Sequence, residues 1–151
     1  MSATISLLAE RPAAAIAPLL KIWEGAVRAT HDFLTEKDIR QLAPLVEQGL
    51  LAVPQLAVIR DESGAVKGFL GVDDDKIEML FIEAGRRGQG LGRKLVDYAV
   101  EQLGASLVDV NEQNILGVGF YRRLGFVQFA RSPLDGQGNP FPLLHLKLPT
   151  Q

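Results

Sequence analysis

The feature that most constrains the fold is a buried strand that leads through a glycine-rich turn into an amphipathic helix. Residues 77–82 are apolar on both faces except at Glu78, which is typical of a central strand covered by helices. The turn Arg87-Gly88-Gln89-Gly90-Leu91-Gly92 follows, and apolar residues then recur at helical spacing up to Leu103. Such a turn directs backbone N–H groups outward from the positive end of a helix, so it predicts a site for a phosphate or diphosphate.

The segments on either side predict an α+β chain. Pro12 suits the first turn of one helix, and Thr35 with Asp38 suits the cap of a second that ends at Gly49. A further helix is expected from about Asn114 to Leu124. Strands are expected at Thr4–Leu8, Leu56–Ile59, Val66–Val72, Ile77–Ile82, Leu107–Val110, Phe126–Arg131 and Phe141–Leu148. We therefore expect one domain over residues 1–151, with a mixed, mostly antiparallel central sheet flanked by about four helices.

Composition excludes several classes of function. The chain of 151 residues has a net charge of −2, so it lacks the positive field that attracts nucleic acid. It has no cysteine and only two histidines, so we expect neither disulfides nor a metal site. Glu10, Arg11 and Pro12 interrupt the apolar N-terminal stretch before it reaches signal or membrane-span length. The expected location is therefore cytoplasmic, without membrane attachment.

Two other families also bind phosphates on glycine-rich turns, and the spacing disfavours both. A P-loop requires Lys and then Ser or Thr after its last glycine, whereas Leu91 and Gly92 follow Gly90. The dinucleotide fingerprint requires a glycine three residues after its second glycine, where this chain has Arg93. An NTP-binding protein and a Rossmann enzyme are therefore both disfavoured.

The remaining pattern resembles the GNAT superfamily of N-acetyltransferases. Arg87, Gly90 and Gly92 match its R-x-x-G-x-G motif, and residues 119–126, Gly-Phe-Tyr-Arg-Arg-Leu-Gly-Phe, match its F-Y-x-x-x-G-F pattern. The order of strands and helices resembles the GNAT fold over nearly the whole chain. Residues 29–34, 111–114 and 140–144 look especially like the bacterial YjaB-type acetyltransferases.

The resemblance implies acetyl-CoA as the acyl donor. In this family two strands splay apart around the pantetheine arm, which places that role on the strand ending at Ile82 and the strand at 107–110. The implied cofactor-binding residues are Met79, Leu80, Phe81, Ile82, Arg87, Gly88, Gln89, Gly90, Leu91, Gly92, Arg93, Asn114 and Tyr121. Arg86 and Lys94 would add positive charge near the diphosphate, although basic residues of this kind also occur as a solvated face.

Acyl transfer requires a neutral amine, a stabilised oxyanion and a proton for the leaving thiolate. The resemblance assigns the acid to Tyr121, for which core packing is the alternative, and the oxyanion donor to a backbone N–H near Leu80. The base stays open between Glu78, His31 and water. Glu78 suits the role if its burial shifts its pKa, and otherwise lies at an edge or pairs with an arginine. His31 is equally consistent with a surface position, and His145 is most simply structural.

We therefore expect an enzyme that moves an acetyl group to a primary amine, either a small metabolite or a protein lysine or N-terminus, by direct attack in a ternary complex. The alternative is a non-catalytic acyl-CoA sensor or interaction module. The sequence leaves the acceptor open, as well as the acyl-chain preference and the choice between monomer and homodimer, because acceptor pockets are built from variable loops.

Overall fold

The computed structural model describes residues 3–30, 34–86, 88–136 and 138–149. Within these ranges the chain forms seven strands, four α-helices and one short 3-10 helix. The helices are α1 (Ala13–Thr30), α2 (Glu36–Ala52), η1 (Ala84–Arg86), α3 (Leu91–Leu103) and α4 (Ile115–Arg123). The strands are β1 (Thr4–Leu7), β2 (Gln55–Arg60), β3 (Val66–Asp73), β4 (Lys76–Ile82), β5 (Leu107–Asn111), β6 (Val127–Ser132) and β7 (Leu143–Lys147). This order is the one that the sequence predicts.

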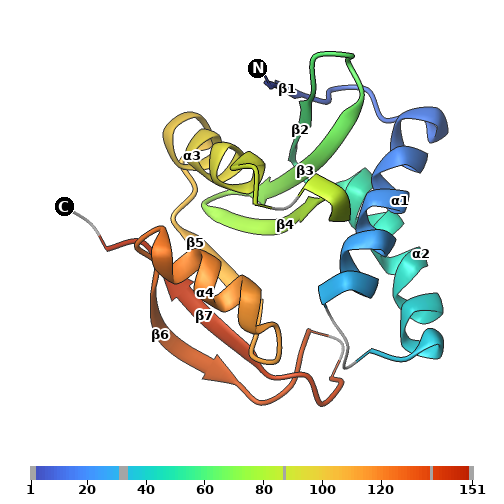
Figure 1. The fold of residues 1–151 in the computed structure, drawn as a ribbon. Helices are drawn as coiled ribbons and strands as arrows, with labels where there is room; N and C mark the ends of the chain where they lie inside the picture. The colour runs from blue at the N-terminus through green and yellow to red at the C-terminus, as the bar shows by residue number, and fades with distance from the viewer. Residues whose placement is uncertain (1–2, 31–33, 87, 137, 150–151) are drawn as a thin grey trace. The chain divides into compact units, whose positions relative to one another are not determined.

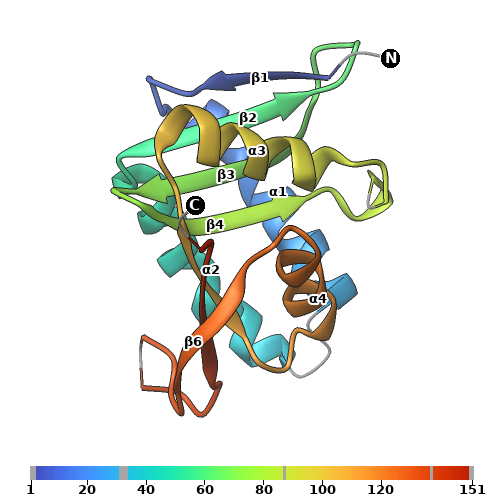
Figure 2. The ribbon, with the colours of Figure 1, turned by 90° about the vertical axis from the view of Figure 1, so that its left-hand side faces the viewer.

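The chain divides into two compact units, Met1–Ala105 and Ser106–Gln151. In the first unit β1, β2, β3 and β4 lie side by side in chain order, and each pair is antiparallel (Figure 2). Tight turns join β2 to β3 and β3 to β4, so this part of the sheet is a meander of neighbours in sequence. The C-terminal end of β4 therefore lies at the same end of the strands as the β2–β3 turn. The short helix η1 and the glycine-rich turn come directly after β4 at this end of the sheet.

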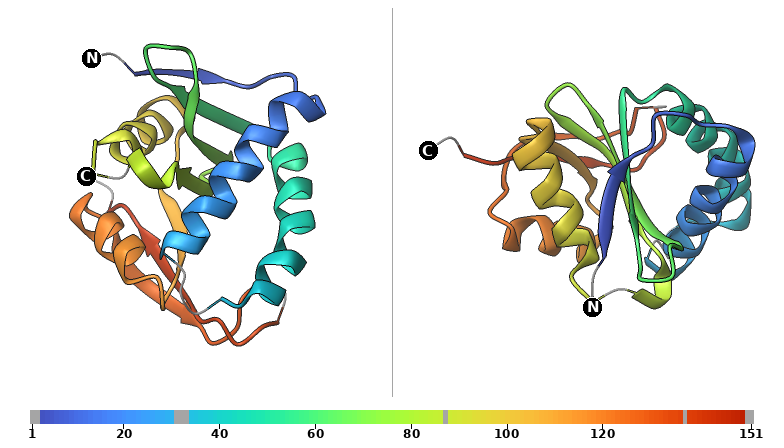
Figure 3. Two further views of the ribbon diagram at one scale, coloured as in Figure 1. Left: turned by 45° about the vertical axis from the view of Figure 1, so that its right-hand side comes forward. Right: turned by 90° about the horizontal axis from the view of Figure 1, so that it is seen from above.

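Helices cover both faces of the sheet in the first unit. The helices α1 and α2 pack on one face and α3 on the other, as the view from above shows (Figure 3). The core between α1, α2 and the sheet includes Leu19, Trp23, Leu50 and Phe69. Leu95, Val96 and Ala99 are the buried residues of α3. Burial of apolar surface on both faces of a sheet is the main force that holds such a layered unit together.

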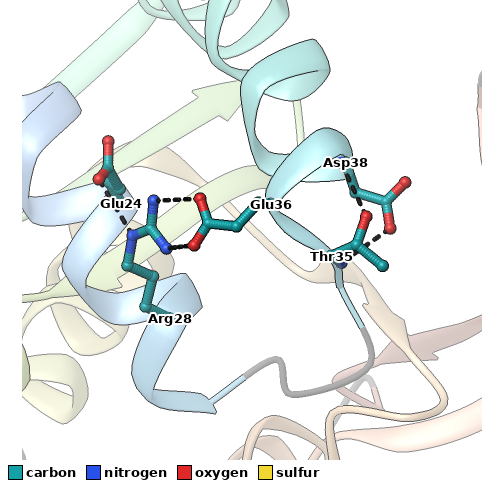
Figure 4. Close-up of polar contacts among 5 residues, drawn as sticks. All are labelled: Glu24, Arg28, Thr35, Glu36 and Asp38. Atoms are coloured by element: carbon teal, nitrogen blue, oxygen red, sulfur yellow. Dashed lines mark hydrogen bonds and ion pairs between the residues drawn. The ribbon is translucent and has the colours of Figure 1, made fainter.

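The start of α2 carries the capping box that the sequence predicts (Figure 4). The Asp38 backbone N–H donates to Thr35 Oγ1 at 3.1 Å, and the Thr35 N–H donates to Asp38 Oδ2 at 2.9 Å. Two of the N–H groups that a helix start leaves without partners are thereby satisfied. The same view shows Arg28 of α1 paired with Glu24 and Glu36, which ties α1 to the first turn of α2.

The second unit is a three-stranded antiparallel sheet with one helix. Here β7 lies between β5 and β6, so β5 pairs with a strand that is not the next one in sequence. The helix α4 contacts β5 (Figure 1). Its end is fixed by the Phe126 N–H, which donates to the Tyr121 carbonyl oxygen at 3.0 Å, and by Gly125 at φ 100°. A helix closed in this way delivers the chain directly into β6.

At two element boundaries the structure differs from the sequence expectation for a local reason. The prediction that α2 ends at Gly49 is wrong, because the helix continues to Ala52 and the residue before Pro54 is extended. The last strand begins at Leu143 rather than Phe141, since Pro140 and Pro142 have no N–H to donate to a ladder. The strand pair expected to splay is divided between the two units and stays a prediction, as does a single domain over 1–151.

Candidate functional site

The glycine-rich turn contains two residues in the left-handed region of backbone conformation. Gly88 has φ 83° and Gly90 has φ 79°, and Gly90 is the N-cap of α3. These conformations favour glycine because a Cβ would clash with the backbone. Beyond the glycine itself and its two chain neighbours, a Cβ placed on either residue would meet no atom within 4 Å. The turn is therefore shaped by backbone conformation rather than by packing, and it leaves space for a ligand against its main chain.

The first turn of α3 presents backbone N–H donors that have no partner among the residues the structure describes. The helix ladder begins with the Lys94 N–H, which donates to the Gly90 carbonyl oxygen at 3.1 Å. The N–H groups of Leu91, Gly92 and Arg93 precede that bond, and Gly90 has no side chain to cap them. Unpaired N–H groups and the positive end of the helix dipole together favour an anion at this position.

Positive side chains lie beside the turn, but they are not equivalent. Arg86 Nη2 lies 3.4 Å from Asp61 Oδ2, and its Nε lies 4.0 Å from Glu83 Oε2. The enclosed Glu83 Oε2 also lies 2.9 Å from Lys67 Nζ, an ionic contact without hydrogen-bond geometry. Arg86 is thus partly neutralised. Arg93 and Lys94 are exposed and make no ion pair within the described part of the chain.

A cavity of about 460 Å³ opens next to the same turn, within the first unit. Four of its lining residues are cations and two are carboxylates, so its walls carry a net positive charge. The lining residues are Ala3, Ile59, Arg60, Asp61, Glu62, Ser63, Lys67, Arg86, Gln89, Leu91 and Lys94. The cavity reinforces the positive character of this end of α3.

Strand β4 contains an irregularity at Glu78. Gly71 of β3 pairs with Met79 and Val72 pairs with Ile77, so Glu78 is an extra residue that bulges from the ladder. Its side chain is 39% exposed and lies 3.8 Å from Lys76. Of the two alternatives that the sequence leaves open for Glu78, burial is therefore wrong, because a bulged residue leaves the alternation that would turn it inward. Met79, Leu80, Phe81 and Ile82 are half-buried beyond the bulge.

The second unit holds the other two expected cofactor residues, on α4. Asn114 is the N-cap of this helix, and its Oδ1 accepts from the Gly117 N–H at 3.1 Å. Seven residues later Tyr121 is buried, with its ring edge-to-face against Phe120 and Phe126 at 5.0 and 5.4 Å. Asn114 therefore has a structural function whether or not it binds a ligand.

Burial raises the pKa of the Tyr121 phenol well above its usual value, because the ionised form loses its solvation. The hydroxyl makes no hydrogen bond with any described residue. Its oxygen is nevertheless not fully enclosed by protein. Tyr121 is thus protonated at neutral pH, and its hydroxyl has no competing partner among the described residues. A protonated phenol without a competing partner can serve as a general acid.

The first unit brings together β4, the glycine-rich turn and the start of α3, while Asn114 and Tyr121 share α4 of the second. Arg87 and His31 lie outside the described residues. Sequence reasoning missed one polar cluster: His145 of β7 contacts Asp109 of β5 and Ser132 of β6. No local pattern reveals it, because strands distant in sequence assemble it.

Comparison with known proteins identifies the family. Residues 54–128, which contain β4, the turn, α3 and α4, match the acetyltransferase (GNAT) domain. The chain is also 39% identical over 87% of its length to the peptidyl-lysine N-acetyltransferase YjaB of Salmonella typhimurium, covering 90% of that protein. The chain belongs to the GNAT acetyltransferase family. It is an acetyl-CoA-dependent N-acetyltransferase.

Solved structures agree with the GNAT fold. The solution structure of apo-form YjaB from Escherichia coli matches with a TM-score of 0.87 and 36% identity, over 97% of each chain. The crystal structure of PaiA N-acetyltransferase from Thermoplasma acidophilum in complex with coenzyme A matches with a TM-score of 0.71. It covers 98% of this chain and 99% of its own, and at 16% identity it supports the fold alone.

Two further properties of the described residues concern what a metal site and a membrane-spanning helix require. The described residues contain no group of three or more histidine or acidic side chains arranged to hold a metal ion. None of the helices in the described ranges combines the length and apolar character needed to span a bilayer.

Proposed function

We propose that this GNAT enzyme acetylates the side-chain amine of lysine in proteins or peptides. The observation that carries the proposal is the 39% identity, over 87% of the chain, to a protein named as a peptidyl-lysine N-acetyltransferase. The matched region covers 87% of the chain, so the similarity is not confined to the motifs of the cofactor site. Of the three acceptor classes that the sequence leaves open, namely metabolites, lysines and N-termini, the name of this relative favours lysine.

The residues of the first unit suit the diphosphate of acetyl-CoA. Gly88 and Gly90 adopt conformations that bring main chain to the surface, and a Cβ on either would occupy the space beside it. The N–H groups of Leu91, Gly92 and Arg93 would donate to the phosphate oxygens. Exposed Arg93 and Lys94 would add charge to those bonds. When bound, the cofactor supplies an activated acetyl thioester.

Tyr121 serves as the general acid in this proposal. Its phenol is protonated at neutral pH, where even an unburied tyrosine with a pKa of about 10 keeps its proton, and its hydroxyl has no competing partner among the described residues. It would donate that proton to the departing sulfur as the amine adds directly to the acetyl carbon. We expect Tyr121→Phe to lower kcat by about 100-fold with a smaller change in KM.

Glu78 would accept the proton of the lysine ammonium, directly or through water. The bulge holds its carboxylate outward at the strand, and its exposure makes it accessible to a cationic acceptor. The main-chain N–H groups just beyond the bulge, near Leu80, would face the developing oxyanion. Glu78 is therefore proposed as the base because its carboxylate is exposed to the acceptor, and not because it is buried.

The direct test is acetyl transfer to a lysine-containing peptide. The reaction is measured by release of the coenzyme A thiol and by mass spectrometry of the peptide. A matched peptide with arginine in place of lysine is the control, because it keeps the positive charge but offers no acylable amine of comparable reactivity. We expect one acetyl group on the lysine side chain and none on the control. Acetylation confined to free small amines would contradict the assigned acceptor while leaving the family activity intact.

A further inference from the structure

Three polar side chains of the second unit form a connected set outside the acetyltransferase site. His145 Nδ1 lies 2.6 Å from Asp109 Oδ1, and His145 Nε2 lies 2.7 Å from Ser132 Oγ. The set spans three adjacent strands, because Asp109 and His145 are register partners between β5 and β7 and Ser132 is on β6. Both distances are those of strong hydrogen bonds.

The donors and acceptors in this set have only one consistent arrangement around a neutral imidazole. A carboxylate accepts but cannot donate, so the proton of the ring lies on Nδ1 and is donated to Asp109. Nε2 is then left with a lone pair, which accepts the Ser132 hydroxyl proton. Asp109 thereby orients the ring, and His145 is positioned to remove the proton of Ser132. A nucleophile, a base and an orienting carboxylate in this order are the parts of an activated serine.

The set is accessible rather than sealed in a core. The side chains of His145 and Asp109 are each 22% exposed, and Ser132 is half-buried. Phe129, an exposed residue of β6, lies with its ring centroid 6.2 Å from that of His145. Lys147 Nζ lies over the Phe129 ring, 5.5 Å from its centroid. The surroundings of His145 therefore include the apolar ring of Phe129, with the Lys147 cation against that ring.

We propose that Ser132, His145 and Asp109 form a second acyl-transfer centre, which cleaves esters of short-chain carboxylic acids. Ser132 Oγ forms a bond to the ester carbonyl carbon while its proton passes to His145 Nε2. The bond from that carbon to the leaving oxygen then breaks, and the leaving oxygen takes the proton from Nε2. Water adds to the resulting acyl-serine with the same proton transfers, which releases the acid and restores the serine.

The first test uses p-nitrophenyl acetate as the ester and follows release of p-nitrophenolate. We expect Ser132→Ala and His145→Gln each to lower the rate by at least about tenfold, and Asp109→Asn to lower it less. Because free imidazole also cleaves this ester, Ser132→Ala is the decisive variant. A Ser132→Ala protein that cleaves the ester at the wild-type rate would overturn the proposal. Acetylation of a lysine peptide by the same variant should be unchanged, which shows that it is folded.

The second test depends on the absence of cysteine from the chain. Ser132→Cys introduces a single thiol beside His145, and Ser106→Cys introduces one at another half-buried position of the same unit. A base within hydrogen-bond reach converts a thiol to the reactive thiolate. We expect iodoacetamide at neutral pH to modify the Ser132→Cys protein at least about tenfold faster than the Ser106→Cys protein. His145→Gln should remove that difference, and equal rates in the two single variants would overturn the proposal.

Discussion

Tyr121 and Glu78 are the two described residues to which we assign proton transfer in lysine acetylation, and their surroundings are opposite. Tyr121 is buried against two aromatic rings with a raised pKa, whereas Glu78 lies exposed on a bulge beside Lys76. Burial disfavours the phenolate, so Tyr121 holds its proton more tightly than a free phenol and is protonated throughout the neutral range of pH. A base that must meet a charged acceptor benefits from access.

The environment of Tyr121 predicts how stability depends on pH. Its pKa is higher in the folded chain than in the unfolded chain, so above about pH 10 the unfolded state releases a proton that the folded state retains. The free energy of unfolding should then fall by up to about 1.4 kcal/mol per pH unit from this residue alone. Urea unfolding between pH 9 and pH 11 should show a shallower decline for Tyr121→Phe than for wild type. Parallel curves would mean that the phenol is not desolvated.

Glu78 is tested by removing its charge while keeping its size. We expect Glu78→Gln to lower kcat for a lysine peptide by at least about tenfold, with little change in stability because the side chain is exposed. Steady-state kinetics and a melting curve check the two parts. Glu83→Gln provides a carboxylate control at the end of the same strand. Full activity of Glu78→Gln would assign proton removal to water or to another residue.

At the scale of elements, the sequence predicts what is local. The capping box of α2 and the helix between Gly90 and Gly104 are visible because their signals lie within a few residues of one another. The bulge at Glu78 is not visible, since it depends on how β3 and β4 align. The contact between His145 and Asp109 is hidden for a similar reason: β5 and β7 pair across 36 residues, and alternation alone does not specify which strands become neighbours.

The capping box gives a stability prediction for α2. Thr35→Ala removes the oxygen that accepts the Asp38 N–H, so the free energy of unfolding should fall by about 1 kcal/mol. Thr35→Ser keeps the hydroxyl and should be close to wild type. Chemical denaturation of the three proteins measures both effects. An equal loss in the Ala and Ser variants would show that the methyl group, rather than the hydrogen bond, is what matters.

At the scale of the whole molecule, a chain with a net charge of −2 concentrates positive charge at one helix end. Arg93 and Lys94 make no ion pair with another described residue there, while Arg86 is held by Asp61 and Glu83. The family and its acetyl donor are recognisable from sequence because backbone conformation and helix dipole depend on a short motif. The acceptor is not recognisable in this way, because it depends on surfaces assembled from distant segments.

The most direct test of the central claim is calorimetric titration of coenzyme A into Gly90→Ala and Gly104→Ala proteins. The two glycines cap opposite ends of α3, have φ of 79° and 73°, and have no atom within 4 Å of an added Cβ. Both variants should therefore lose about 1 kcal/mol of stability from backbone strain. If the N-terminal turn holds the diphosphate, Gly90→Ala should bind coenzyme A at least about tenfold more weakly, and Gly104→Ala should bind it as wild type does. Equal affinity in the two variants would contradict the account.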